Sequence, residues 1–155
     1  GASSTTTVDM SYTYLGWAQR NFDLNGLSHG KHELIQADAL QWLKENRARY
    51  GLIFLDPPTF SRSKRMEDTL DIQRDQEELI RDTAALLEPD GILIFSTNNR
   101  RFKLAREGLT GLEIEDITRR TLPQDFERNP RIHQCFRIGR SRKGPRKPVS
   151  RPSGR

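Results

Sequence analysis

The sequence predicts an α/β domain whose β-sheet is mostly parallel and closes with an antiparallel hairpin. Strand-like runs and amphipathic helical segments alternate along most of the chain, which is the pattern of a doubly wound parallel sheet. The last two strand-like runs have no obvious helix between them, which indicates an antiparallel pair. With 155 residues, 34% of them hydrophobic, the chain is long enough to bury the core of one domain.

Two strand–helix units are expected in the first third of the chain. Residues 5–8 are β-branched and predict a strand, and the following helix is indicated by apolar residues at helical spacing, Leu15, Ala18 and Phe22. Asn25-Gly26 ends this helix. Residues 33–37 predict the second strand, and Asp38 is expected to cap a helix that extends to about Arg49.

A third strand is expected at residues 52–55, where a continuous apolar run is typical of a strand buried on both faces of a parallel sheet. It ends at Asp56-Pro57-Pro58, and a polar, basic loop comes after it. The longest helical pattern comes next, and its apolar face consists of Ile72, Leu79, Ile80, Thr83, Leu86 and Leu87.

The last third of the chain is expected to complete the sheet. Pro89-Asp90-Gly91 predicts a turn into a strand at residues 92–95, and a weaker helix is expected at residues 102–109. Residues 113–119 and 133–138 are the expected strands of the antiparallel hairpin, and a long loop joins them.

The net charge of +5 is carried by the C-terminal end of the chain. Residues 140–155 contain five Arg, two Lys and no acidic residue. The rest of the chain therefore has 19 basic and 21 acidic residues. This segment is rich in Pro, Gly, Ser and Arg and cannot form a core, so we expect an ordered domain over residues 1–139 and a basic, disordered tail over residues 140–155. The tail either keeps the protein soluble or grips RNA phosphates.

Composition also argues against several classes of protein. No apolar run approaches the roughly 20 residues of a membrane span. The single Cys135 can form neither an internal disulfide nor a cysteine cluster, and the three histidines lack the spacing of metal ligands, so we assign no metal. Nothing in the sequence indicates secretion, and a reducing cytoplasm is the expected compartment.

Three carboxylates, Asp9, Asp38 and Asp56, each come directly after a predicted strand. Ligands of open parallel sheets bind outside the carboxyl ends of the strands, so these side chains are expected to line one crevice. Residues of the next strand end join them there, namely Ser96, Asn98 and Asn99. A single Asp in such a place is commonly a helix cap, but three in succession favour a binding site.

Each of these positions has an expected role. Asp9 is placed to accept hydrogen bonds from ribose hydroxyls, and Met10 can pack on an adenine face. Asp38 can accept from the adenine amine, with the backbone of Ala39 beside it. Both roles indicate a cofactor that contains adenosine without deciding which one.

The segment Asp56-Pro57-Pro58 is a sharper signal. Two prolines fix the backbone and remove two N–H donors, which leaves a rigid turn that offers carbonyls and a carboxylate. A turn that offers only acceptors can hold the amine of a base and stabilise positive charge on a nitrogen that is being methylated. Phe60 can stack on that base. The alternative is a Pro-Pro loop that only ends a buried strand.

A family resemblance rests on four stretches of sequence: Val8-Asp-Met-Ser11, Leu55-Asp-Pro-Pro-Thr-Phe-Ser61, Ser63-Lys-Arg-Met66 and Gln124-Asp-Phe126 through Ile132-His133. In combination they resemble the class I S-adenosylmethionine-dependent RNA methyltransferases. The resemblance is closest to the C-terminal domain of the bifunctional large-subunit rRNA guanine methyltransferases, the RlmKL type. It covers roughly residues 2–139.

The resemblance implies a Rossmann-like class I methyltransferase sheet and methyl transfer from S-adenosylmethionine to N7 of a guanine in 23S rRNA. In that family an N-terminal partner domain methylates the exocyclic N2 of another guanine. The family's C-terminal domain begins with a strand, a glycine-containing loop and a helix, and the loop cradles the methionine end of the cofactor. Residues 1–139 match only the part of that domain beyond its first helix. They therefore correspond to a partial domain, and alone they are expected to bind the cofactor poorly and to lack activity.

Residue by residue, the resemblance assigns Asp9 and Asp38 to the cofactor and Asp56-Pro57-Pro58 to the catalytic edge beside the target base. Asp56 is expected to border the cofactor as well. The basic residues of the adjoining loop are candidates for holding RNA phosphates, and ordinary solvated loop charge explains them equally well. They are Arg62, Lys64 and Arg65, to which Arg100 and Arg101 can be added from the next strand end.

Other functions stay open at this point. Methylation of another RNA base, either N2 of guanine or C5 of cytosine, and methylation of a small molecule use the same fold. The C5 reaction needs a thiolate, and Cys135 lies midway along a predicted strand rather than after a catalytic motif. A nicotinamide-dependent enzyme is disfavoured by Asp56-Pro57-Pro58, and an RNA-binding remnant without turnover is the non-enzymatic alternative.

Overall fold

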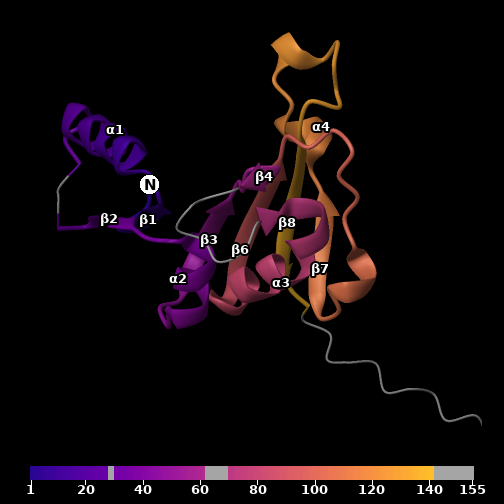
Figure 1. Cartoon of the computed structure of the whole chain (residues 1–155), viewed down its shortest axis with the longest axis horizontal. Helices are drawn as coiled ribbons and strands as arrows, with labels where there is room; N and C mark the ends of the chain where they lie inside the picture. The colour runs from indigo at the N-terminus through magenta and orange to yellow at the C-terminus, as the bar shows by residue number, and fades with distance from the viewer. Residues whose placement is uncertain (28–29, 62–69, 142–155) are drawn as a thin grey trace, which may run out of the picture. The chain divides into compact units, whose positions relative to one another are not determined.

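The computed structural model describes residues 1–27, 30–61 and 70–141. The chain divides into two compact units, Gly1–Arg47 and Ala48–Arg155, and each unit has its own β-sheet (Figure 1). Within the described ranges, no helix combines the length and the apolar character needed to cross a membrane.

The first unit consists of two strand–helix pairs in the predicted order. Strand β1 (Thr5–Asp9) and strand β2 (His32–Gln36) are parallel, with Thr5 opposite His32 and Asp9 opposite Gln36. Helix α1 (Tyr12–Leu24) comes after β1, and helix α2 (Ala39–Glu45) comes after β2. Helix α2 is shorter than predicted because Asn46 takes an extended backbone conformation, which ends the helix four residues before Arg49.

Side chains at the ends of these helices explain where they begin and end. The Ser11 hydroxyl accepts a hydrogen bond from the Tyr14 amide at 3.3 Å, and Asp38 accepts one from the Leu40 amide at 2.8 Å. Both bonds satisfy amides that have no partner within the first turn of a helix. After α1, Gly26 has a φ of 65°, which glycine adopts without steric cost.

The second unit is built on a four-stranded sheet in the order β3-β6-β8-β7. Its strands are β3 (Tyr50–Leu55), β6 (Leu87–Thr97), β7 (Leu112–Asp116) and β8 (Gln134–Arg140). Strands β3 and β6 are parallel, whereas β8 is antiparallel to both of its neighbours. The predicted α/β architecture with an antiparallel C-terminal hairpin is therefore confirmed, and β8 of this hairpin lies between β6 and β7.

Helix α3 (Ile72–Ala85) covers one face of this sheet (Figure 1). Its apolar side is buried, as the spacing predicts, and the facing sheet residues are buried as well: Leu93, Phe95, Phe136 and Ile138. The rings of Phe95, Phe102 and Phe136 lie within 6.3 Å of one another, centroid to centroid. This cluster fixes the carboxyl half of β6 against β8.

Strand β3 differs from its prediction because only one of its faces is covered. Leu52 and Phe54 are 65% and 68% exposed, whereas Ile53 and Leu55 are partly buried. Alternate residues of a strand point to opposite faces, so the face of β3 that carries Leu52 and Phe54 is uncovered by the described residues of the second unit. Within this unit, the prediction of burial on both faces is therefore wrong.

The turn predicted at residues 89–91 lies within β6, which already begins at Leu87. Leu87 pairs with Tyr50 and Ile92 with Leu52, so the intervening residues of β6 loop out of the pairing and bring Gly91 back beside Glu88. A Cβ atom at Gly91 would lie 2.8 Å from the Tyr50 carbonyl oxygen, so glycine permits this close approach.

The predicted helix at residues 102–109 is reduced to one 3₁₀ turn, η1 (Arg106–Gly108). Two glutamines of α3 occupy the Lys103 carbonyl oxygen, which a helix would pair with an amide one turn later: the side-chain amides of Gln73 and Gln76 donate to it at 3.0 and 3.1 Å. The strand predicted to reach Arg119 also ends earlier, at Asp116. There the carboxylate accepts a hydrogen bond from the Thr118 amide at the start of helix α4 (Thr118–Thr121).

The domain boundary predicted at residue 139 falls one residue inside β8. The guanidinium of Arg140 donates to the carbonyl oxygens of Ala84 and Ala85 at 3.4 and 3.0 Å, so this residue belongs to the fold. From residue 142 onward, the predicted basic tail lies outside the described residues.

Candidate functional site

In the first unit, the two predicted cofactor carboxylates come at the ends of neighbouring parallel strands. Asp9 is the last residue of β1, and Asp38 comes two residues after the end of β2. The amide of Ala37 donates to the Asp9 carbonyl at 3.3 Å, which keeps the two strand ends together. Both side chains therefore lie at the carboxyl edge of this sheet, as predicted.

Both carboxylates are held by local hydrogen bonds that use one of their two oxygens. Oδ1 of Asp9 accepts from the Ser11 amide at 2.6 Å, and Oδ1 of Asp38 accepts from the Leu40 amide. Within the described part of the chain, Oδ2 of each is left without such a bond, so each carboxylate keeps an acceptor for a ligand. Met10 is partly buried beside Asp9, and Ala39 is at the start of α2.

In the second unit, Asp56 comes directly after β3 and lies next to the end of β6. The hydroxyl of Ser96 donates to Oδ1 of Asp56 at 2.6 Å, across 40 residues of sequence. The hydroxyl of Thr59 similarly bonds the side-chain oxygen of Asn98 at 3.0 Å. These contacts confirm that polar residues of the two strand ends meet at one edge, and they place Ser96 and Asn98 beside the Asp56 loop.

The rest of this loop offers acceptors and one aromatic ring. Neither Pro57 nor Pro58 has an amide hydrogen to donate. Phe60, in the short strand β4 (Phe60–Ser61), is 51% exposed. The predicted phosphate-binding residues Arg62, Lys64 and Arg65 lie outside the described residues.

Cys135 is unsuited to act as a nucleophile. It lies in β8, is 2% exposed, and burial raises the pKa of its thiol. A buried thiol with a raised pKa is protonated at neutral pH and does not supply a thiolate. This finding disfavours the cytosine C5 reaction, as the sequence indicated.

The structure thus supports two parts of the predicted constellation separately. Asp9 and Asp38 share an edge in the first unit, whereas Asp56 and Ser96 share one in the second. The three carboxylates lie in two units, so their convergence on a single crevice remains a prediction.

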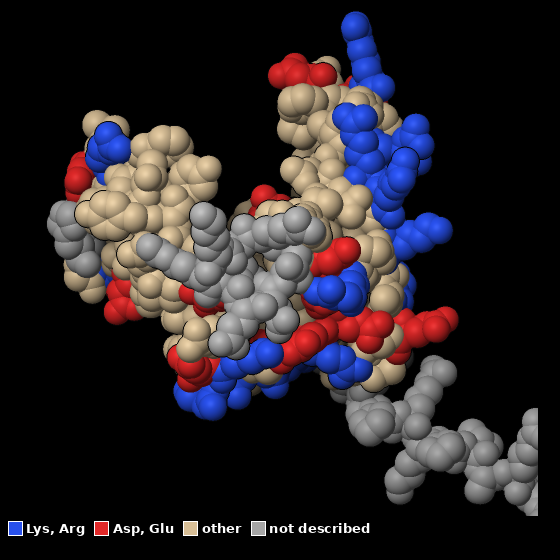
Figure 2. Space-filling view, viewed as in Figure 1, with Lys and Arg blue, Asp and Glu red and all other residues tan. Residues whose placement is uncertain are grey.

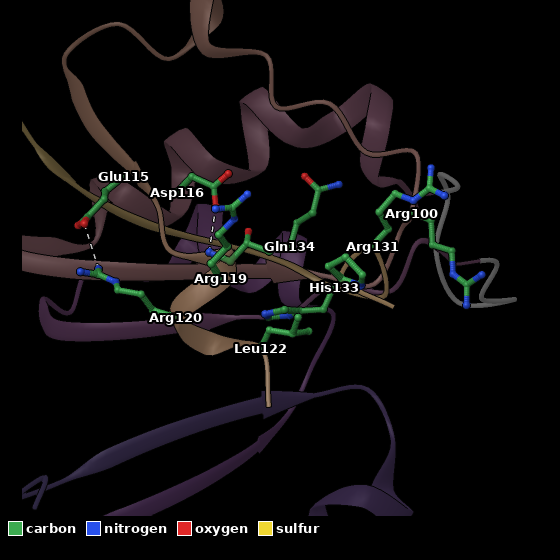
Figure 3. A pocket seen from close by; sticks show the side chains of 11 residues that line it. Arg100, Glu115, Asp116, Arg119, Arg120, Leu122, Arg131, His133 and Gln134 are labelled. Carbon is green, nitrogen blue, oxygen red and sulfur yellow. Dashed lines mark hydrogen bonds and ion pairs between the residues drawn. The ribbon is translucent and has the colours of Figure 1, made fainter. Parts of the chain in front are cut away.

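A pocket lined by arginines lies at the same edge of the four-stranded sheet as Asp56, and most of it is not predicted from the sequence (Figure 3). It has a volume of about 560 Å³. Its four arginines are Arg100, Arg119, Arg120 and Arg131. Only Arg100 is among the candidates that the sequence provides. The others lie within the connection between β7 and β8, and their concentration in this one connection was the available signal.

Comparison with known proteins identifies relatives of this sequence. No family model matches the chain. It is 62% identical over 141 residues to the ribosomal RNA large subunit methyltransferase K/L of Methylococcus capsulatus, and 59% identical over 140 residues to that of Allochromatium vinosum. Each match covers 89% of this chain but 19% of the relative. The chain therefore spans about a fifth of the length of these curated relatives.

Solved structures show the same fold. A methyltransferase in complex with SAH superposes with a TM-score of 0.71 and 25% identity, over 89% of this chain and 39% of the other. A SAM-dependent methyltransferase from Agrobacterium tumefaciens gives 0.67 with 19% identity, over 87% and 48% of the two chains. The chain is thus related to one segment of the ribosomal RNA large subunit methyltransferases K/L and has the Rossmann-like fold of class I S-adenosylmethionine-dependent methyltransferases.

Proposed function

We propose that this chain is part of a methyltransferase that transfers a methyl group from S-adenosylmethionine to N7 of a guanine in 23S rRNA. The observation that carries the proposal is the Ser96–Asp56 hydrogen bond, because it holds the Asp56-Pro57-Pro58 loop at the carboxyl edge of the sheet. Ligands of this class of fold bind at that edge. The similarity to rRNA methyltransferases supports RNA as the substrate.

The residues of the first unit fit the adenosine half of the cofactor. Asp9 keeps one carboxylate oxygen to accept from the ribose hydroxyls, and Met10 can pack on the adenine ring. Asp38 is proposed to accept from the adenine amine, with the backbone of Ala39 beside it. Bound there, S-adenosylmethionine supplies an electrophilic methyl group on a sulfonium.

The residues of the second unit fit a reaction at guanine N7. This nitrogen already has a lone pair and needs no general base, so alignment is the main requirement. The new N–C bond leaves a positive charge on the base, and the carboxylate of Asp56 stabilises that charge. Ser96 fixes the carboxylate, the prolines keep the loop rigid, and Phe60 is placed to stack on the base.

The proposal extends to the whole protein. A second methyltransferase domain, N-terminal to this one, is the expected partner, because the curated relatives are about five times longer than the matched segment. The protein is proposed to act in the cytoplasm on rRNA.

The second candidate is methylation at another position of an RNA base. Of the two such positions, N2 of guanine is better supported than C5 of cytosine. An exocyclic amine must lose a proton when it is methylated. The Asp56 carboxylate and the carbonyl oxygens of Pro57 and Pro58 are acceptors that could hold that amine. The burial of Cys135 argues against C5 of cytosine.

The experiment compares the protein, in the complete form that its gene encodes, with an Asp56→Ala variant. Calorimetry measures S-adenosylmethionine binding, and radiolabel transfer to deproteinised 23S rRNA, followed by separation of the labelled nucleosides, measures the formation of 7-methylguanosine. We expect the unsubstituted protein to bind the cofactor and form 7-methylguanosine, and the variant to bind the cofactor but form hardly any 7-methylguanosine. Full activity of Asp56→Ala would refute the role given to this residue, and absence of methyl transfer by the unsubstituted protein would refute the function itself.

A further inference from the structure

The arginine-lined pocket in the second unit lies close to the proposed reaction site. Strand β8 begins at Gln134, which pairs with Thr97 at the end of β6, and β6 in turn lies beside β3 and Asp56. Neighbouring strands are about 4.8 Å apart, so the pocket begins roughly 10 Å from Asp56 along the edge of the sheet. A polynucleotide with its target base at Asp56 would pass close to it.

The charges in the pocket do not cancel. Arg120 pairs with Glu115 at 3.0 Å, and Asp116 has a pKa lowered chiefly by its hydrogen bonds with Thr118, with Arg106 and Arg119 adding attraction. The two acidic residues therefore already have basic neighbours. Within the described ranges, the guanidinium groups of Arg100 and Arg131 have neither a hydrogen bond nor an ion pair, so each keeps all five N–H donors for a ligand.

The remaining lining suits a ligand with both charged and uncharged parts. Leu122 and Pro130 add apolar surface, and the His133 ring is held by the Thr121 hydroxyl at 2.9 Å. Figure 2 shows Lys and Arg side chains gathered along one side of the region around α4, the helix that carries Arg119 and Arg120 of the pocket lining. Several cationic side chains in one place suit a chain of phosphates.

We infer that this pocket binds the phosphate backbone of the substrate RNA next to the target base, with Arg100 and Arg131 as the phosphate ligands. Guanidinium groups match phosphate geometry and form charge-assisted hydrogen bonds with it. Contacts of this kind carry no sequence information but fix the register of a nucleic acid on the protein. The inference rests on the proposed function, since it takes RNA as the substrate.

The test uses Arg100→Gln and Arg131→Gln, each in the complete protein. The matched control is Arg49→Gln, because Arg49 is exposed and lies just before β3, at the opposite edge of the same sheet. Binding of deproteinised 23S rRNA is measured over a range of salt concentrations. We expect each pocket variant to lose about tenfold in RNA affinity and about 0.7 in the slope of log affinity against log salt.

The controls separate the inference from the proposed function. All three variants are expected to keep the melting temperature and the S-adenosylmethionine affinity of the unsubstituted protein. If that protein methylates rRNA but the pocket variants bind RNA no worse than Arg49→Gln, the inference is overturned while the function stands. If it neither binds nor methylates rRNA, the function itself is wrong.

A titration with inorganic phosphate tests the alternative source of the same ligand chemistry. We expect weak competition with RNA, because one phosphate replaces only part of a backbone. Tight phosphate binding that depends on Arg100 and Arg131, together with unchanged RNA affinity in both variants, would assign the pocket to a small anion and contradict the inference.

Discussion

Asp9 and Asp38 on one side, and Asp56 on the other, are all strand-end carboxylates, but their hydrogen bonds differ. The first two accept from backbone amides two residues further along, whereas Asp56 accepts from the Ser96 side chain, 40 residues away. The bonds of the first two are those of any turn or helix cap. The bond of Asp56 exists only because two strands end side by side. The proposed cofactor residues are therefore held by local hydrogen bonds, whereas the proposed catalytic residue is held by a contact between distant parts of the sequence.

The largest effect is expected from Asp56→Asn, which keeps the size of the side chain and removes its charge. The rate of 7-methylguanosine formation should fall by about 100-fold or more, since a charge-stabilising group is lost. The S-adenosylmethionine dissociation constant should change much less. Ser96→Ala is the control for positioning, and it should lower turnover by a smaller factor. Equal and small effects of both changes would mean that Asp56 only organises the loop.

The next effect concerns Asp9. Asp9→Asn should weaken S-adenosylmethionine binding by about tenfold or more, because hydrogen bonds to a charged group are lost. Turnover at saturating cofactor should be nearly retained. The measurement is calorimetry together with kcat at high cofactor concentration. A loss of kcat without a loss of affinity would reverse the roles given to Asp9 and Asp56.

Asp38 allows its cap to be separated from its cofactor contact. Asp38→Ala should lower the free energy of unfolding by about 1 kcal/mol, whereas Asp38→Asn should nearly preserve it, since Asn also caps helices. Denaturant unfolding measures both. Both variants should bind the cofactor more weakly than the unsubstituted protein. Unchanged cofactor affinity in both would reduce Asp38 to a helix cap.

The smallest effect on chemistry is expected at Cys135. Cys135→Ala should leave the methylated nucleoside and the turnover rate unchanged, because the buried, protonated thiol takes no part in the reaction. Nucleoside analysis of the treated rRNA checks this. Loss of activity in a Cys135→Ala variant that is still folded would instead support methylation at C5 of cytosine.

Much of this arrangement could be predicted from the sequence, and the exceptions have physical causes. The order of the main strands, α3 and the capping role of Asp38 can be derived from periodicity and side-chain chemistry, which are local. The lost helix at residues 102–109 depends on Gln73 and Gln76 of α3, about 30 residues earlier, which no local pattern contains. The arginine pocket was missed for a similar reason, since Arg100 comes after β6 whereas its other arginines lie in the β7–β8 connection.

The central claim is that the protein methylates N7 of a guanine in 23S rRNA. The complete protein is incubated with deproteinised 23S rRNA and S-adenosylmethionine, and the digested nucleosides are identified by mass spectrometry. The account expects 7-methylguanosine, absent when Asp56→Ala replaces the unsubstituted protein. If 7-methylguanosine persists in the Asp56→Ala reaction, or if the unsubstituted protein forms none, the claim is contradicted.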